Sequence, residues 1–438
     1  MIPVLFLLLA PVSVFAQQRA ITHEDVWMLH RIGPPALSPD GKLAVFSVTE
    51  PSYDAAQNVS DLWIVPTDGS APAKKLTNTR GGESGAAFSP DGKTLAFSAR
   101  RDGDEAEQIY LLPLDGGEAR RLTNIPTGAG SPSFRPDGKA VMFTANFAEG
   151  AKTLDEHKKL SDEQKARKDT ARTYDAFPVR FWNAWLEKRE PVFGWQEVDG
   201  KTPTMIAVAP LRGSFGGSIN EELSPTWTPD GKSIVFQAIA NRHNGMFEES
   251  EMALYVVPAG GGTAKRITPL GTSYSNPTFS PDGQALYAAE SRTSTAKQIY
   301  FVNRLARLTG PDWSQVQIVT AGWDRSVGGV SFADNGRTLY IEAQDLGTTK
   351  IFRTAATGGT PEVAYAPETG SVTGLQSEGG VIVGRYAAST DPGQIVRFDP
   401  AKKSYTTLTS FNKERLAQLR LPNPEHFWFT AKNGKKIH

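Results

Sequence analysis

Serine is the residue type in this chain whose spacing comes nearest to a known catalytic motif. A serine nucleophile elbow needs Gly-x-Ser-x-Gly between a strand and a helix, and the 438 residues contain no such pentapeptide. The nearest strings are Gly-Thr-Ser-Tyr-Ser at 271–275 and Gly-Glu-Ser-Gly at 82–85. A short strand follows each of them where an elbow needs a helix, so we interpret both as loops between repeated units. The sequence predicts no catalytic residue within this chain.

Metal-ligating residues are also poorly placed for chemistry. The chain has no cysteine, which excludes disulfides, a thiol nucleophile and cysteine metal sites. The six histidines are scattered, without the spacing of a helical zinc motif. Asp102-Gly103-Asp104-Glu105 offers carboxylates but lacks the other ligands of a calcium loop, so we interpret it as a hairpin tip. We expect neither a metal site nor a cofactor.

The strands that would position any functional site follow a short repeated sequence motif, Ser-Pro-Asp-Gly or a variant of it. Proline presets the second position of a tight turn, aspartate tolerates the third, and glycine takes the positive φ that closes it. A strand of alternating apolar residues follows each copy, and most copies continue with a second apolar strand and a basic-Leu-Thr tag. The copies begin at Ser38, Ser89, Arg135, Thr228 and Ser280, with a worn sixth copy at Ala333.

The spacing of these copies predicts an all-β fold, a β-propeller. The turn glycines lie 46 to 53 residues apart, except for a double gap of 93 between Gly138 and Gly231. Four-stranded units of this length are what propeller blades need. A degraded unit from about Ser371 to Phe411 brings the expected count to seven four-stranded blades over residues 33–412. The alternative, a β-sandwich with coincidental turns, does not explain six aligned turns with matching apolar columns.

Charge and the first residues bear on partners and location. Basic and acidic residues number 47 each, which does not favour a nucleic acid or an anionic membrane as partner. Residues 2–10 are apolar but too few to span a bilayer, and a small-residue cleavage site follows Ala16. We interpret residues 1–16 as a signal peptide and expect export to the periplasm or the medium. The sequence leaves open whether the chain forms an oligomer.

Two helical segments are predicted outside the blade pattern. Residues 17–32 contain a Thr22 cap with Asp25 three residues later, which predicts a short lead-in helix. Between about 147 and 202 the strand rhythm stops, and a highly charged stretch predicts a helical insertion in the third unit, either one solvated helix or a helical hairpin.

An aromatic cluster follows the charged stretch. Seven aromatic residues lie between Tyr174 and Trp195, and we expect so many to be buried. In one interpretation these aromatic residues pack on the surface of the propeller itself. In the other, Trp182, Trp185 and their neighbours help to line an interdomain cavity.

The last segment, residues 413–438, reads as a linker followed by half a hairpin. A strand around Phe427–Thr430 precedes an Asn433-Gly434 turn and the first residues of a returning strand. A chain that stops there exposes an apolar strand edge. We therefore expect a following domain, truncated at His438.

Taken together, these motifs resemble the N-terminal part of prolyl oligopeptidase-family serine peptidases. The resemblance rests on the apolar leader, the Thr-His-Glu-Asp string that starts at Thr22, the Ser-Pro-Asp-Gly-Lys turns and the exit through Phe-Thr-Ala-Lys-Asn-Gly-Lys-Lys-Ile at 429–437. The dipeptidyl-peptidase and acylaminoacyl-peptidase-like branch is the most similar, and Arg-Phe-Trp-Asn-Ala-Trp at 180–185 is similar to an insertion in the dipeptidyl-peptidase 5 group.

The resemblance implies that a C-terminal α/β-hydrolase domain carries the catalytic triad, so no catalytic residue is assigned here. The propeller would cap the active site and admit short peptides, and a carboxylate near the cavity mouth would bind a free amino terminus. The candidates, chosen by location, are Glu187, Glu190, Glu221 and Glu222. The alternative function is a non-catalytic periplasmic propeller that binds proteins, similar to the propeller protein of the Tol–Pal system. That protein carries an α/β domain ahead of its propeller, for which residues 17–32 leave no room.

Overall fold

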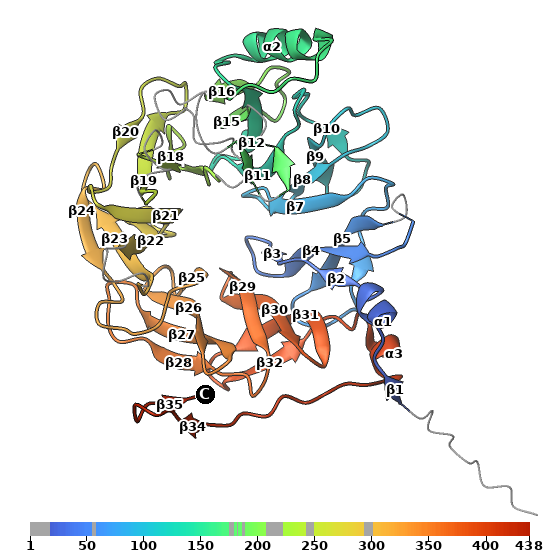
Figure 1. Ribbon diagram of the computed structural model, residues 1–438, viewed down its shortest axis with the longest axis vertical. Helices are drawn as coiled ribbons and strands as arrows, with labels where there is room; N and C mark the ends of the chain where they lie inside the picture. Colours follow the sequence, from blue (N-terminus) through green and yellow to red (C-terminus); the bar gives the residue numbers. More distant parts are fainter. Residues whose placement is uncertain are drawn as a thin grey trace, which may run out of the picture.

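The computed structural model describes residues 18–54, 58–174, 179–181, 183–185, 189–206, 222–241, 249–292 and 301–438. Antiparallel sheets of consecutive strands stand around a common centre (Figure 1). The predicted all-β propeller architecture is therefore confirmed. The expected signal peptide, residues 1–16, lies outside the described residues.

The sheets are built in chain order, so each contains one local stretch of the sequence. The first two contain β2 (Arg31–Ile32), β3 (Ala36–Leu37), β4 (Leu43–Glu50), β5 (Val59–Pro66) and β6 (Lys74–Lys75), then β7 (Glu83–Phe88), β8 (Thr94–Ala99), β9 (Gln108–Pro113) and β10 (Arg120–Arg121). The next two contain β11 (Gly130–Phe134), β12 (Ala140–Ala148), β15 (Arg189–Glu197) and β16 (Thr204–Ile206), then β17 (Thr226–Trp227), β18 (Ser233–Ile239), β19 (Met252–Pro258) and β20 (Lys265–Arg266).

The remaining strands continue the same order. They are β21 (Thr272–Phe279), β22 (Leu286–Arg292), β23 (Arg304–Thr309) and β24 (Gln315–Ile318), then β25 (Val330–Ala333), β26 (Thr338–Asp345), β27 (Thr348–Ala355) and β28 (Glu362–Tyr365), and finally β29 (Ser371–Glu378), β30 (Val381–Ala388), β31 (Asp391–Asp399) and β32 (Ser404–Thr407). A single parallel pair, Thr349 with Ser371, joins the last two sets.

Each Pro-Asp-Gly phrase forms the turn from the first to the second strand of its sheet. The Gly41 N–H donates to the Ser38 carbonyl oxygen at 2.8 Å, and the Asp40 carboxylate accepts from the Ser38 hydroxyl at 2.7 Å. That hydroxyl and the Lys42 N–H lower the pKa of Asp40. The turns also stack from sheet to sheet: a Cβ on Gly283, whose φ is +69°, would lie 2.8 Å from Pro229 of the preceding turn.

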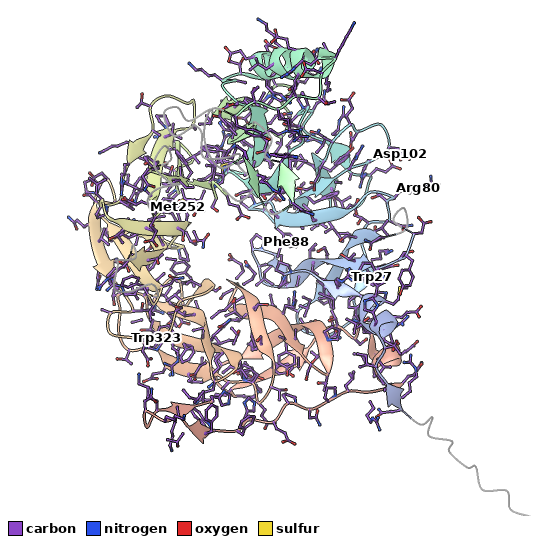
Figure 2. All side chains as sticks on the ribbon, viewed as in Figure 1. Trp27, Arg80, Phe88, Asp102, Met252 and Trp323 are labelled. Carbon is purple, nitrogen blue, oxygen red and sulfur yellow. The ribbon has the colours of Figure 1, made fainter. Side chains whose placement is uncertain are left out.

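The core lies between neighbouring sheets. Four phenylalanines occupy the same place in the second strands of four sheets, five residues after the turn glycine, and each is at most 1% exposed: Phe46, Phe97, Phe143 and Phe236. Figure 2 shows side chains filling the spaces between sheets, with Phe88 toward the centre of the ring and Asp102 on its outer side. Burial of apolar area between sheets is thus repeated around the ring.

The two short serine strings that we interpreted as loops belong to strands instead. Residues 82–85 enter β7 and residues 271–275 enter β21, both of them first strands of a sheet. A bulge interrupts each strand, between Ser84 and Ala87 and between Ser275 and Thr278. The bulge breaks the apolar alternation, which is why the pattern did not predict a strand.

The ring closes by side-chain packing between the first and the last sheet. Ile32 and Phe46 of the first sheet share a buried cluster with Val383 and Ile395 of the last. Phe411, just after β32, packs edge-on against Trp63 at a ring-centroid distance of 4.9 Å and against Phe46 at 6.1 Å. Within the described residues, no strand of one of these sheets pairs with a strand of the other.

The two chain ends meet beside this closure. The backbone of His30 and the side-chain amide of Asn412 exchange two hydrogen bonds, of 2.8 and 3.0 Å. Further out, β1 (Arg19–Ala20) pairs in parallel with β33 (Leu419–Arg420). Helices α1 (His23–Trp27) and α3 (Lys413–Leu416) lie next to each other there (Figure 1).

The predicted lead-in helix is confirmed as α1. Thr22 and Asp25 form both hydrogen bonds of a capping box. The buried Asp25 also accepts two hydrogen bonds from the Arg19 guanidinium, at 2.6 and 2.7 Å, and Arg415 lies 3.8 Å away. The Arg19 guanidinium holds the pKa of Asp25 well below its usual range. One carboxylate therefore ties the first and last helices together.

The interruption of the third unit is shorter than the predicted 147–202. Strand β15 begins at Arg189 and pairs with β12 along nine residues, so the excursion from the sheet covers about 149–188. Among the described residues of the excursion, one helix is present, α2 (Leu154–Ala166), which lies outside the ring (Figure 1). These residues therefore show the first predicted alternative, one solvated helix, and not a helical hairpin. Two-residue strands β13 (Arg180–Phe181) and β14 (Ala184–Trp185) follow.

The C-terminal segment forms the predicted hairpin. Strands β34 (Phe429–Thr430) and β35 (Lys436–Ile437) pair antiparallel, and Gly434 has a φ of +79° in the turn between them. Phe427 is 71% exposed, and its neighbours Trp428 and Phe429 are about half exposed.

Truncating Phe411 should weaken ring closure. Replacing it with alanine removes the ring that fills the space between Trp63 and Phe46, so we expect Phe411→Ala to lower the free energy of unfolding by about 2 kcal/mol. Urea denaturation followed by tryptophan fluorescence measures the loss. The exposed Phe427→Ala is the control and should change it by less than about 0.5 kcal/mol. Equal effects of the two variants would contradict a closing role for Phe411.

Candidate functional site

The ring has two different ends, and the candidate site lies at the end where the chain enters. Adjacent strands alternate in direction, so first strands begin and fourth strands finish at one end, opposite the Pro-Asp-Gly turns. His30, just before β2, and Asn412, after β32, meet at that end. We call it the entry face.

A cavity of about 650 Å³ opens at the entry face around the third sheet. It is bounded by strands of the third sheet and the segments that precede β9, β11 and β17. We call it the acidic cavity, because the ionisable residues in its described lining are Glu107 and Glu222. Of the residues that the structure describes, the lining comprises Glu107, Thr127–Ser131, Thr144–Asn146, Pro191, Val192 and Glu222–Pro225.

The sheets differ in how far one side chain reaches toward the next sheet. Six residues after the turn glycine, three sheets carry a long polar residue that reaches the first strand of the next sheet, whereas the other four carry a short one: Ser47, Ser98, Thr144 and Ala289. Gln237 accepts from the Asn276 N–H at 2.7 Å, Glu342 accepts from the Leu375 N–H at 2.8 Å, and Arg385 donates to the Ile32 carbonyl oxygen at 3.2 Å.

Thr144 holds this position in the third sheet. Its hydroxyl donates to the Gly130 carbonyl oxygen of its own sheet at 3.3 Å. The space that Gln237 fills between the fourth and fifth sheets is therefore open between Thr144 and Ser224.

Two serines on the cavity wall have a strained backbone. Ser131 has a φ of +53° in the bulge of β11, and Ser224 has a φ of +41° two residues before β17. The left-handed region costs a residue with a Cβ about 1 kcal/mol or more, and such residues cluster at functional sites. Asn276 and Gly374 have positive φ at the corresponding bulges, so the conformation is a shared feature of these sheets.

The acidic cavity favours a cationic ligand. Within the part of the chain that the structure describes, neither the Glu107 nor the Glu222 carboxylate forms a hydrogen bond or ion pair. Surrounding protein atoms displace some water and raise the pKa of Glu107, although the residue is exposed to solvent. An ammonium group near the two carboxylates would form charge-assisted hydrogen bonds with them.

A second cavity, of about 460 Å³, lies under α2 and shares Thr127 with the first. We call it the α2 cavity. His157, 2% exposed, lines it and fixes the helix: its Nδ1 accepts from the Ala148 N–H at 2.9 Å, and its ring stacks on Phe147 at 5.1 Å. Burial, with a smaller contribution from Arg189 and Lys165, lowers the pKa of His157. The histidine is therefore neutral, with its proton on Nε2.

The structure brings one of the predicted site residues into the acidic cavity, Glu222. Glu190 is buried in β15, where its carboxylate accepts from the Gly150 N–H at 3.3 Å. Trp185 is not buried as expected: it is 52% exposed and stacks on Tyr174 at 6.3 Å. Trp182, Glu187 and Glu221 lie outside the described residues.

Glu107, Thr144, Ser131 and Ser224 were not predicted from the sequence. Thr144 carries no distinct signal, because Ser47, Ser98 and Ala289 are also short at the same position of the repeat. Glu107 carries no signal either, since it lies just before a strand in a segment without a repeat motif.

Two further features concern ions and membranes. Asp104 accepts from the Tyr110 hydroxyl and pairs with Arg121, which places residues 102–105 in the predicted hairpin tip. Among the described residues, no three histidine or carboxylate side chains are grouped to hold a metal ion. Of the helices in the described ranges, none has the length and apolarity to cross a bilayer.

Comparison with known sequences identifies relatives of this chain. Residues 52–175 match the family described as the Tricorn protease N-terminal beta propeller domain. Dipeptidyl-peptidase 5 of Porphyromonas gingivalis is 26% identical over 427 residues, 94% of this chain and 59% of the relative. A peptidase of Bacillus subtilis, YuxL, is 24% identical over half of this chain and 31% of its own length. The chain thus spans less than two thirds of these relatives.

Solved structures with the same fold include peptidases. The acylaminoacyl peptidase of Pyrococcus horikoshii superposes with a TM-score of 0.69 at 15% identity, over 94% of this chain and 57% of that one. The β-propeller domain of the Trilobed protease from Pyrococcus furiosus, described as having an open velcro topology, gives 0.59 at 14% identity over 88% of this chain and 99% of its own. The expected resemblance to the propeller part of prolyl oligopeptidase-family peptidases is confirmed.

Protonation of His157 should release α2. The unfolded pKa is about 6.5 and the folded pKa is lower, so the docking interaction is complete above pH 6.5 and is lost as the pH falls through the folded value. We expect amides of residues 148–166 to exchange hydrogen faster at pH 5 than at pH 7.5, after correction for intrinsic rates. His157→Phe keeps the ring stack but cannot titrate, and it should abolish the difference. A pH response that persists in this variant would assign it to another group.

Proposed function

We propose that this chain is the substrate-admitting part of a serine peptidase that cleaves short peptides. The premise is its likeness to the propeller portions of prolyl oligopeptidase-family peptidases. The catalytic α/β-hydrolase domain would lie outside this chain. The observation that carries the proposal is the match to dipeptidyl-peptidase 5, which covers nearly all of this chain but only 59% of that protein. Its remaining length leaves room for a catalytic domain.

The proposed role is that of a filter at the entry face. The acidic cavity opens at the end of the ring where both chain ends emerge, so a domain connected through residues 413–438 would face it. The rigid ring would exclude folded proteins, and Glu107 and Glu222 would attract the free ammonium group of a peptide. Trp182, Trp185, Glu187, Glu190 and Glu221 stay predictions as substrate contacts.

Several finer features belong to the same proposal. We propose seven blades, with the 149–188 excursion as an insertion in the third. We also propose that residues 1–16 direct the protein out of the cytoplasm, to the periplasm or the medium.

A hydrolysis assay on the full-length protein tests the function. We expect dipeptidyl p-nitroanilides with a free amino terminus to be cleaved, and a serine-reactive fluorophosphonate to abolish cleavage. N-acetylation of the substrate should lower kcat/KM roughly tenfold, because it removes the charge that the two glutamates bind. If the protein is folded but cleaves none of these substrates, the result would contradict the proposal and favour the alternative, a non-catalytic propeller that binds proteins.

Filling the acidic cavity should impair substrate binding. Thr144→Gln places in the third sheet the side chain with which Gln237 bridges the fourth and fifth sheets, so we expect KM for free-amino substrates to rise roughly tenfold. The free energy of unfolding should change by less than about 1 kcal/mol, since the added atoms fill space that is already open. Thr406→Gln, on the exposed strand β32, is the matched control. An unchanged KM in Thr144→Gln would separate the cavity from substrate binding.

A further inference from the structure

One wall of the acidic cavity belongs to a part of the third sheet that is only two strands wide. Strand β11 pairs with β12 as far as Thr144, and β16 pairs with β15 from Phe193 onward. In the described part of this sheet, residues 145–148 and 189–192 are therefore paired only with each other. We call these eight residues the extension. Its half nearer the sheet, residues 145–146 and 191–192, lines the acidic cavity.

The far end of the extension is held by α2. A two-stranded ribbon is at best marginally stable without further packing, so the contacts at this end matter. Leu154 of α2 packs against the buried cluster that contains Phe147 and Val192. His157 adds two contacts: its ring stacks on Phe147 at 5.1 Å, and its Nδ1 accepts from the Ala148 N–H at 2.9 Å. Both rings are almost fully buried.

Only the neutral ring of His157 can make the hydrogen bond to Ala148. An imidazolium carries a hydrogen on both ring nitrogens, so its Nδ1 would present a donor to the Ala148 N–H. Among the described residues, the charged groups that face His157 across the α2 cavity are Lys165 of the same helix, Arg189 of β15 and Glu105 ahead of β9. Strand β12 has no ionisable residue. Burial, and then Arg189 and Lys165, lower the pKa of His157.

A loss of this hydrogen bond would reach the cavity along the strands. Ala148 pairs with Arg189 at the tip of the extension, and Asn146 pairs with Pro191 two residues nearer the sheet. Asn146 and Pro191 both line the acidic cavity. Because paired strands fray from their ends, a tip without its restraint loosens the pair that forms the cavity wall.

We propose that His157 is a pH-sensitive positioning residue for the acidic cavity: its neutral ring keeps the extension in the shape that binds a cationic peptide terminus, and its protonation weakens that binding. This rests on the proposed function and adds a form of regulation to it. The binding shape is complete above about pH 6.5, the ordinary pKa of histidine, and is lost as the pH falls through the lower folded value.

Equilibrium binding of tri-alanine amide to the full-length protein at pH 7.0 and pH 5.0 tests this role. The peptide has no carboxylate, and its α-amino group is largely charged at both pH values. Calorimetry is done after treatment with a fluorophosphonate, so that hydrolysis cannot consume the peptide. We expect the dissociation constant to rise roughly tenfold from pH 7.0 to pH 5.0.

Two variants remove the titration of His157 in different ways. His157→Gln supplies an amide oxygen that can accept from the Ala148 N–H, and His157→Phe keeps a ring on Phe147. Both should reduce the pH effect to about threefold or less, the remainder coming from protonation of Glu107 and Glu222. The control His23→Gln replaces an exposed histidine of α1 and should behave like the unaltered protein.

Hydrogen exchange of the backbone amides within the extension provides a readout that needs no ligand. After correction for intrinsic rates, exchange should be faster at pH 5.0 than at pH 7.0 in the unaltered protein and should not change with pH in His157→Gln. This measurement also decides the matter if the variants bind the peptide too weakly to compare.

The outcomes separate this inference from the function on which it rests. A pH effect of equal size in the unaltered protein and both His157 variants overturns the positioning role and leaves the peptide-binding cavity standing, with its carboxylates as the titrating groups. Exchange within the extension that does not depend on pH in the unaltered protein overturns the role as well. Absence of peptide binding at pH 7.0 overturns both the role and the proposed filter.

Discussion

Closure of the ring is the constraint on which the rest of this structure depends. Each sheet is made of consecutive strands, and in the part of the chain that the structure describes no strands pair between the first sheet and the last. They are joined by side-chain contacts, which include a buried cluster around Phe46 and Val383, the Phe411 ring and the hydrogen bonds of Asn412 and Arg385. Every other interface between sheets is also crossed by the backbone, which keeps neighbours close. The closing interface lacks that restraint, and it holds together because apolar burial and a few specific hydrogen bonds are enough.

Side chains between the sheets also bear on where the ring has room for a ligand. Three pairs of neighbouring sheets are bridged at one level by Gln237, Glu342 or Arg385, which satisfy backbone groups of the next sheet. Thr144 reaches only its own sheet, and the space between it and Ser224 is open beside two strained serines. Other sheets also carry a short residue at this position, so the bridge is one of several contacts that together determine where space remains.

Much of the fold could be predicted from the sequence because the repeat is local. Pro-Asp-Gly fixes a turn, alternation fixes the strands beside it, and Thr22 with Asp25 fixes α1; each signal lies within a few residues. First strands were harder, since the bulges near Gly85 and Asn276 interrupt their alternation. The candidate site was hardest: Glu222 was chosen by location, whereas Glu107 and Thr144 become neighbours only when two sheets meet. Trp185 was expected in the interior because it is aromatic, yet a two-residue strand pair leaves it half exposed.

The parallel pairing of β1 with β33 has a mechanical consequence. The chain before Arg19 and the chain after Arg420 leave this pair at opposite ends, so tension between them would load its hydrogen bonds in shear. Shear requires the bonds to break together, whereas an antiparallel pair pulled from one end opens one bond at a time. The ring itself would carry no load until the pair had slipped. In this geometry the β1–β33 pair carries a force that passes along the chain, and the propeller, which lies between these two strands in the sequence, does not carry it.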